Sequence, residues 1–186
     1  MRKDLGAKPL LFPQPVMIIG TYDENMVPNA MNAAWGGICG YDEIMVDLGS
    51  HKTTDNIALN KAFTIGIADE KHTVACDYVG IVSANDEPEK LKIAGFTTEK
   101  SKFVNAPVIN ELPITIECEL KEIIGSKYIG KIKNVVADES IIGEDGKPDL
   151  SKFSPITFDP VHLSYVALGK ETGKAFECGK NLGKIK

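Results

Sequence analysis

The chain lacks the residue spacings of several common site types. Its four cysteines, Cys39, Cys76, Cys118 and Cys178, are scattered without a C-x-x-C pair, which excludes a zinc knuckle, an iron–sulfur cluster and a thioredoxin-type motif. Its three histidines show no H-E-x-x-H or comparable ligand spacing. We therefore predict no metal site, and free thiols in a reduced cytoplasm.

A basic balance and a long hydrophobic run are also missing. The net charge of −5 argues against a nucleic-acid partner, which would need a basic face. No apolar stretch approaches membrane-spanning length, and Pro9 and Pro13 interrupt the apolar run near the start, so we predict neither a membrane segment nor a secretory signal. With 186 residues, we expect a single cytoplasmic domain over residues 1–186.

Two familiar nucleotide motifs are absent or incomplete. No G-x-G-x-x-G follows a strand-like segment, so a Rossmann fold has no support. Residues 125–131 (GSKYIGK) fit the first seven positions of a P-loop, but Ile132 stands where a Ser or Thr would hold magnesium. That segment also precedes a strand rather than a helix, and we predict a hairpin there.

The pattern that is present is one of short strands. Residues 114–124 alternate apolar and charged side chains, and Gly125-Ser126-Lys127 turns them into a second strand at residues 128–137. Further strands are predicted at residues 16–22, 44–48, 63–68 and 162–168, short helices at 54–62, 73–79 and 88–94, and a loop at 143–155. This order predicts a mainly β domain, an antiparallel barrel with short helices.

The most informative stretch runs from Asn29 to Ile57. A segment of small and amide side chains, NAMNAAW (29–35), suits close approach of the backbone to a flat heteroaromatic ring. After a strand comes SHKTT (50–54), whose hydroxyls, lysine and helix-start N–H groups suit a phosphate. The alternatives are that Thr53 or Thr54 only caps the helix and that Trp35 is an ordinary core residue.

Together with the later blocks at residues 79–120 and 159–183, these motifs resemble the flavin reductase-like FMN-binding split barrels, and among them the flavoredoxin-like branch. The resemblance spans about Pro15 to about Leu182. It implies an antiparallel Greek-key split β-barrel, a homodimer, and non-covalent FMN. It also implies hydride transfer from NADH or NADPH to flavin N5, with electrons leaving to a flavin, protein or metal acceptor. The chemistry belongs to the flavin, so no catalytic side chain is assigned.

The resemblance also implies a set of FMN-binding residues. It places small and amide residues and Trp35 near the ring, the SHKTT cluster at the phosphate, and Lys90 beside the pyrimidine end of the reduced flavin. The full set is Asn29, Ala30, Met31, Asn32, Trp35, Gly49, Ser50, His51, Lys52, Thr53, Thr54, Asn56, Ser83, Ala84, Lys90 and Tyr165.

The chain departs from the family pattern near Lys127. Relatives usually carry a His there, in a segment linked to nicotinamide binding, whereas this chain has none between His72 and His162. Lys131 stands where an acidic residue is common, and Ala84 replaces a Gly. The missing His favours an alternative, an electron carrier that exchanges electrons only with a redox partner protein. A second alternative is a barrel that has lost its cofactor, against which the intact SHKTT cluster argues.

Overall fold

The computed structural model describes residues 1–182. Its strands are β1 (Gln14–Pro15), β2 (Met17–Tyr22), β3 (Pro28–Ala33), β4 (Gly36–Gly40), β5 (Glu43–Asp47), β6 (Ala62–Ile67), β7 (Thr98–Lys100), β8 (Pro107–Ile109), β9 (Ile114–Ile124), β10 (Lys127–Ala137), β11 (Ile156–Asp159) and β12 (Ser164–Ala167). Its helices are α1 (Lys52–Asn60), α2 (Thr73–Ile81) and α3 (Lys90–Ile93), with 3-10 turns at Glu70–His72, Glu139–Ile141 and Cys178–Leu182.

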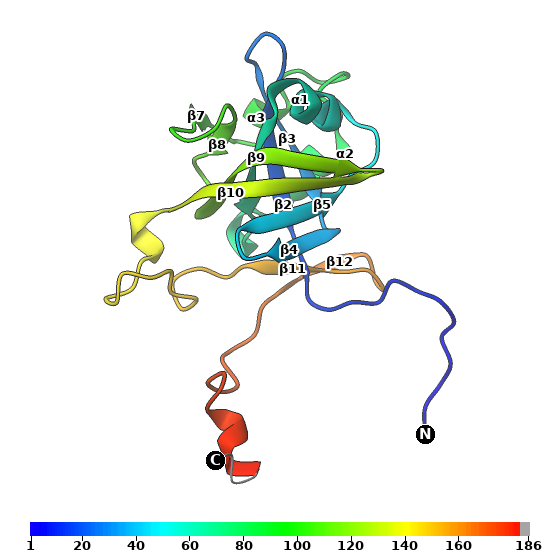
Figure 1. Cartoon of the computed structure of the whole chain (residues 1–186), viewed down its shortest axis with the longest axis vertical. Coiled ribbons are helices and arrows are strands. Elements are labelled where there is room, and N and C mark those ends of the chain that lie inside the picture. Colours follow the sequence, from blue (N-terminus) through cyan, green and yellow to red (C-terminus); the bar gives the residue numbers. More distant parts are fainter. Residues whose placement is uncertain (183–186) are drawn as a thin grey trace.

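A curled antiparallel sheet of seven strands forms the body, in the order β3-β2-β6-β9-β10-β5-β4 (Figure 1). The long β9–β10 hairpin turns at Gly125, whose φ of 62° is a conformation that glycine adopts without strain. Register shifts between Ile129 and Gly130 and between Ile132 and Asn134 mark irregularities that bend this hairpin. The sheet therefore curls into a half-barrel.

Strand β2 is buried on both faces, and it separates two parts of the core. The side chains of Met17 and Ile19 point into the barrel, where they pack with β5, β6, β9 and α1. Those of Val16 and Ile18 point to the other face, where they pack with α2, α3 and β11. Because successive residues of a strand face opposite sides, one apolar run serves both layers.

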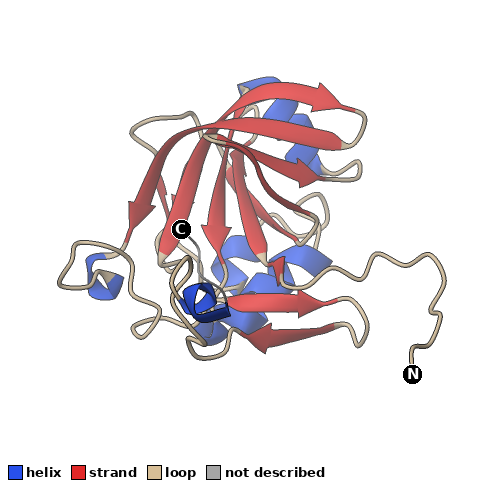
Figure 2. Ribbon diagram, turned by 60° about the horizontal axis from the view of Figure 1, so that its bottom comes forward, coloured by secondary structure: helices blue, strands red, loops and turns tan. Residues whose placement is uncertain are grey.

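The second layer covers β3, an edge strand, with α2 and a small sheet of order β1-β11-β12 (Figure 2). Helix α2 approaches β3 closely at Gly80: a Cβ built there would lie 2.8 Å from the Cβ of Asn32. This close packing therefore requires a glycine at position 80, since any side chain there would clash with Asn32. Strand β3, the end of β5, α2 and the β11–β12 hairpin meet around one hollow.

Several predicted elements are confirmed. Residues 114–124 form β9 with the predicted bounds, residues 125–131 lie in the predicted hairpin, and the short helices lie where expected within a few residues. Two expectations need correction: helix α1 begins at Lys52 rather than Thr54, and the final strand begins at Ser164 rather than His162. Most of NAMNAAW, to which no predicted element was assigned, belongs to strand β3. No helix formed by residues 1–182 has the length and apolar character needed to cross a membrane.

Candidate functional site

A hollow of about 330 Å³ lies between β3, the end of β5 and α2. Its wall includes Met31, Asn32, Trp35, Gly49, His51 and Tyr165, which the sequence predicted, and also Ala33, Ala34, Asp47, Leu48, Asp77, Gly80, Ile81 and Phe158. We call it the ring hollow. Its lining combines small, apolar and aromatic side chains with a few polar groups, which suits a flat heteroaromatic ligand.

A hydrogen-bond chain crosses one wall of the ring hollow. Asn32 Nδ2 donates to the carbonyl of Cys76 at 3.1 Å and to the Tyr165 hydroxyl at 3.2 Å. The Tyr165 hydroxyl donates in turn to Asp77 Oδ1 at 2.7 Å. Burial, reinforced by the Asp77 hydrogen bond, raises the pKa of Tyr165 well above its usual value, so this hydroxyl stays a proton donor. These hydrogen bonds hold the Asn32 side chain of β3 against α2 and β12.

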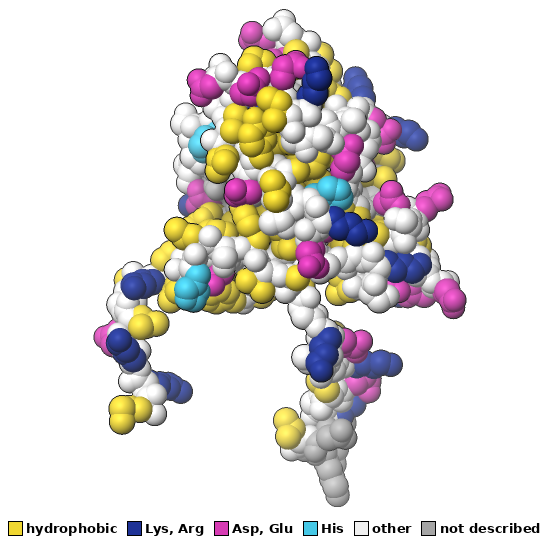
Figure 3. All heavy atoms as spheres, turned by 180° about the vertical axis from the view of Figure 1, so that it is seen from behind, with side chains coloured by type: hydrophobic (Ala, Val, Ile, Leu, Met, Phe, Trp, Pro, Cys, Tyr) yellow, Lys and Arg dark blue, Asp and Glu magenta, His cyan; other side chains and the backbone are white. Residues whose placement is uncertain are grey.

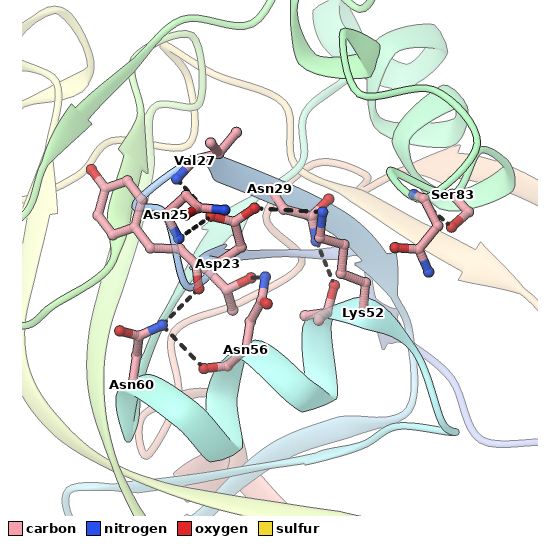
Figure 4. Close-up of polar contacts among 12 residues, drawn as sticks. Asp23, Asn25, Val27, Asn29, Lys52, Asn56, Asn60 and Ser83 are labelled. Atoms are coloured by element: carbon pink, nitrogen blue, oxygen red, sulfur yellow. Dashed lines mark hydrogen bonds and ion pairs between the residues drawn. The ribbon is translucent and has the colours of Figure 1, made fainter.

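A second hollow, of about 300 Å³, adjoins the first, and Met31, His51, Gly80 and Ile81 border both. Predicted residues on its wall are Asn29, Met31, Ser50, His51, Lys52, Thr53, Ser83, Ala84 and Lys90. We call it the phosphate hollow. Figure 4 shows Asn29 and Lys52 together, with Ser83 on a separate segment across from Lys52.

The first turn of α1 forms one wall of the phosphate hollow. The N–H groups at a helix start have no partner within the helix and carry partial positive charge, so they attract an anion. Thr54 Oγ1 accepts from the His51 N–H at 3.0 Å and donates to the His51 carbonyl at 2.7 Å, which fixes this turn. Thr53 lies on the hollow and accepts a hydrogen bond from Asn29 Nδ2 at 2.9 Å.

Two lysines bring positive charge to the phosphate hollow. Lys52 Nζ lies 3.6 Å from Asp23 Oδ2, in the turn after β2 (Figure 4). Lys90 is only 3% exposed, and its Nζ donates to the carbonyls of Val79 at 3.1 Å and Val82 at 2.9 Å, at the end of α2. Burial, and then repulsion from Lys52, lowers the pKa of Lys90 to about 8. Two lysines that repel each other across a hollow favour an anion between them.

The structure places three predicted residues behind the wall instead of on it. Ala30 is fully buried in the core between β3 and α2. Thr54 uses its hydroxyl on the His51 backbone, and Asn56 Nδ2 donates to Thr21 Oγ1 at 3.1 Å. These residues hold α1 and β3 in place. For Asn56 this agrees with the role that the family resemblance implied, support of the turn, and the direct ligand contacts predicted for Ala30 and Thr54 stay predictions.

The structure also places Trp35 and Lys90 relative to the two hollows. Trp35 is 47% exposed and borders the ring hollow, so it is not an ordinary core residue. Lys90 lies on the phosphate hollow with Lys52 and Thr53, rather than among the residues of the ring hollow. The expected place of Lys90, beside the pyrimidine end of the reduced flavin, stays a prediction.

Asp47 and Asp77 on the ring hollow were missed by the sequence reasoning, as was Phe158, which packs on Tyr165. Asp47 is the last residue of β5, a strand that the sequence predicted at residues 44–48, and it lies three positions before the SHKTT segment. Its place near the ligand could therefore have been inferred from the sequence. Asp77 and Phe158 belong to no motif. Asp77 lies 88 positions from its partner Tyr165, and only the fold brings them together.

The lining also fits a ligand with a ring, hydroxyls and a phosphate. Asn29 is 3% exposed and borders the phosphate hollow, yet its Oδ1 accepts no hydrogen bond from the described residues. A buried acceptor without a partner costs free energy, which a ligand hydroxyl at this place would recover. The ribityl chain of FMN offers such hydroxyls between its ring and its phosphate, as the two adjoining hollows require.

The chain was compared with known proteins. Residues 10–145 match the model of the flavin reductase like domain. The uncharacterized protein YdfE of Bacillus subtilis (strain 168) is 29% identical over 94% of this chain and 93% of its own length. The structure of flavoredoxin of Desulfovibrio vulgaris (Miyazaki F) is 40% identical, with a TM-score of 0.92 over 97% of this chain and all of that one.

A flavoredoxin structure from Methanosarcina acetivorans, 24% identical, superposes with a TM-score of 0.87 over 98% of this chain and 100% of its own, which supports the fold. The family model covers most of the chain, and it includes β3, α1, α2 and α3, which form most of both hollows. The chain therefore belongs to the flavin reductase-like family.

Proposed function

We propose that this protein binds FMN non-covalently and passes reducing equivalents from NADH or NADPH to a flavin, protein or metal acceptor. The observation that supports it is the pair of adjoining hollows, one lined by small and aromatic residues and the other by Lys52, Lys90 and the start of α1. A molecule with a flat ring at one end and a phosphate at the other matches both.

The residues divide the work of holding that molecule. The N–H groups at the start of α1, Ser50, Lys52 and Thr53 would hold the phosphate, and Asn29 Oδ1 would accept from a ribityl hydroxyl. Asn32 and the backbone of β3 would face the ring, with Trp35 at its edge. Bound FMN supplies reversible acceptance and donation of electrons. The chain contributes shape, hydrogen bonds and charge, and no nucleophile.

The residue at position 127 bears on the identity of the electron donor. Lys127, at the position where relatives carry a His, lies opposite Asp47 in the β10–β5 register, and its Nζ lies 3.4 Å from Asp47 Oδ2. Asp47 borders the ring hollow, so Lys127 pairs with a residue of the wall of the site. It favours the second candidate function, an electron carrier that is reduced by a redox partner protein rather than by a nicotinamide.

The first experiment is an absorption spectrum of the purified protein after incubation with FMN, followed by anaerobic addition of NADH or NADPH. A flavin spectrum that bleaches with the nicotinamide supports the reductase. A flavin spectrum that persists, yet bleaches with dithionite, supports the carrier. Absence of bound flavin under all conditions would contradict both and leave the barrel without its cofactor.

Lys127→His gives a sharper test of the donor. If the ion pair with Asp47 limits nicotinamide oxidation, the variant oxidises NADH several-fold faster at the same FMN occupancy. Lys133→His is the matched control, because Lys133 pairs with Glu119 at 3.3 Å on the same hairpin and borders neither hollow. Equal rates in Lys127→His and wild type would remove the ion pair as the explanation.

A further inference from the structure

Charge is divided between the two hollows. Both lysines of the site, Lys52 and Lys90, border the phosphate hollow, and both carboxylates, Asp47 and Asp77, border the ring hollow. The two lysines suit a phosphate. The two carboxylates place negative charge next to the ring, the part of the ligand that would take up electrons.

The two carboxylates differ in their partners. Asp47 is paired with Lys127 across the β5–β10 register. Within residues 1–182, no lysine, arginine or histidine forms an ion pair with Asp77, which accepts the Tyr165 hydroxyl at 2.7 Å instead. A hydrogen bond from a neutral donor stabilises a carboxylate but leaves its net charge in place. Asp77 is therefore the uncompensated charge at the ring hollow.

Asp77 also anchors the hydrogen-bond chain on that wall. Its partner Tyr165 accepts from Asn32, and Asn32 packs against Gly80, one turn further along the helix that carries Asp77. Removing the Tyr165 hydroxyl would take away one of the two acceptors of the Asn32 amide, whereas removing only the charge of Asp77 would leave the hydrogen bonds connected. Position and charge can thus be changed separately.

We propose that Asp77 is a positioning residue of the ring hollow whose charge biases the site against reduced, anionic flavin. This inference rests on the proposed binding of FMN. Oxidised flavin takes up two electrons and one proton to become an anion, so the reduced ring carries one additional negative charge. A carboxylate beside that ring, in a partly buried hollow, raises the free energy of the reduced form more than that of the oxidised form.

This bias predicts tighter binding of oxidised than of reduced FMN by the wild-type protein. By linkage, the midpoint potential of bound FMN then lies below that of free FMN. The bound flavin is a stronger reductant than free flavin, which suits a protein that passes electrons onward. Asp77 therefore affects the potential of the bound flavin rather than the presence of the cofactor.

The test is a dithionite titration of the FMN-loaded protein against a reference dye, which measures the midpoint potential at equilibrium. We expect Asp77→Asn to bind FMN and to shift the potential upward, corresponding to an increase on the order of fivefold in relative affinity for reduced FMN. Asp77→Glu keeps the charge and should keep the wild-type potential. Asp145→Asn, the same change on an exposed loop outside both hollows, should leave the potential unchanged.

Tyr165→Phe separates positioning from charge. It should weaken binding of riboflavin, which has the ring but no phosphate, by several-fold, while the potential of any bound flavin stays near that of wild type. Equal potentials in FMN-loaded Asp77→Asn and wild type would overturn the role of Asp77 and leave the proposed function standing. Wild-type protein that binds reduced FMN at least as tightly as oxidised FMN would overturn it without any variant. Failure of the wild type to bind FMN would overturn the proposed function itself.

Discussion

Lys52 is the residue whose charge is most open to a ligand, since it lies on the phosphate hollow and its ion pair with Asp23 is long, at 3.6 Å. Lys52→Ala should weaken FMN binding about tenfold or more, because a charge-assisted contact to a dianion is lost. Riboflavin affinity should stay the same, since it has no phosphate. The melting temperature of the FMN-free protein should change little, because such an ion pair contributes at most about 1 kcal/mol.

Fluorescence titration with FMN and riboflavin measures both affinities. Lys92→Ala is the matched control: Lys92 is exposed on α3, pairs with Glu89 at 3.2 Å, and borders neither hollow. Similar FMN affinity in Lys52→Ala and wild type would show that the phosphate does not lie at the start of α1.

Lys90 makes the phosphate hollow sensitive to pH. Its pKa lies near 8 in the free protein because burial, and then Lys52, disfavours its charged form. A bound phosphate favours the charged form, so its contribution to FMN affinity is present below about pH 8 and declines as pH rises through the pKa of the complex. We expect FMN affinity to fall several-fold between pH 7 and 9.5, measured by the same titration.

Riboflavin affinity should be flat over that range, which provides an internal control for changes in the ring hollow. Lys90→Gln should bind FMN more weakly at pH 7 and lose the slope. The same slope in Lys90→Gln and wild type would assign the pH dependence to another group.

At the scale of elements, the packing of α2 on β3 depends on Gly80. Gly80→Ala would place a Cβ 2.8 Å from that of Asn32, and neither atom can rotate away. The clash should cost about 1–3 kcal/mol, only partly offset by the roughly 1 kcal/mol gain in helix propensity. We expect a lower urea midpoint and weaker riboflavin binding. Gly169→Ala, whose added Cβ meets nothing within 4 Å, should leave both unchanged.

The elements that the sequence predicted well are those with a complete local pattern. Strand β9 alternates over its full length and turns at Gly125, so its bounds followed from periodicity alone. Strand β3 lacks such a pattern, since Asn29, Ala30 and Asn32 have low strand propensity. It is a strand because β2 pairs with it from Met17 to Tyr22 and α2 covers it. Both are tertiary contacts, which the local sequence does not contain.

In the site, too, local motifs were predictable and long-range contacts were not. The SHKTT segment holds hydroxyls and a lysine within five residues, and Ser50, Lys52 and Thr53 lie on the phosphate hollow. The start of α1 was predicted too late in the chain, because the residue that caps the helix is His51. Thr54 lies inside the first turn, where its hydroxyl bonds to the His51 backbone. Asp77 could not be predicted, because its role depends on Tyr165, which only the fold brings near.

At the scale of the whole molecule, two arms project from the same end of the body (Figures 1 and 3). We call residues 1–12 the N-terminal arm and residues 169–182 the C-terminal arm. Leu11 is 70% and Phe176 96% exposed, although both are large apolar side chains. Burying such large exposed apolar side chains against a partner would be favourable. A second copy of this chain, in the homodimer that the family resemblance implied, is the partner we propose for them.

The combined variant Leu11→Ser and Phe176→Ser should therefore weaken self-association without unfolding the domain. Each change removes apolar area that would be buried between copies, at about 25 cal/mol per Å², so the dimer dissociation constant should rise about tenfold or more. Sedimentation equilibrium measures that constant. Leu150→Ser removes a comparably exposed side chain, at 66%, from outside both arms and should leave the dimer intact. A double variant that dimerises as tightly as wild type would contradict the role of the arms, and a monomeric wild-type protein would contradict the dimer itself.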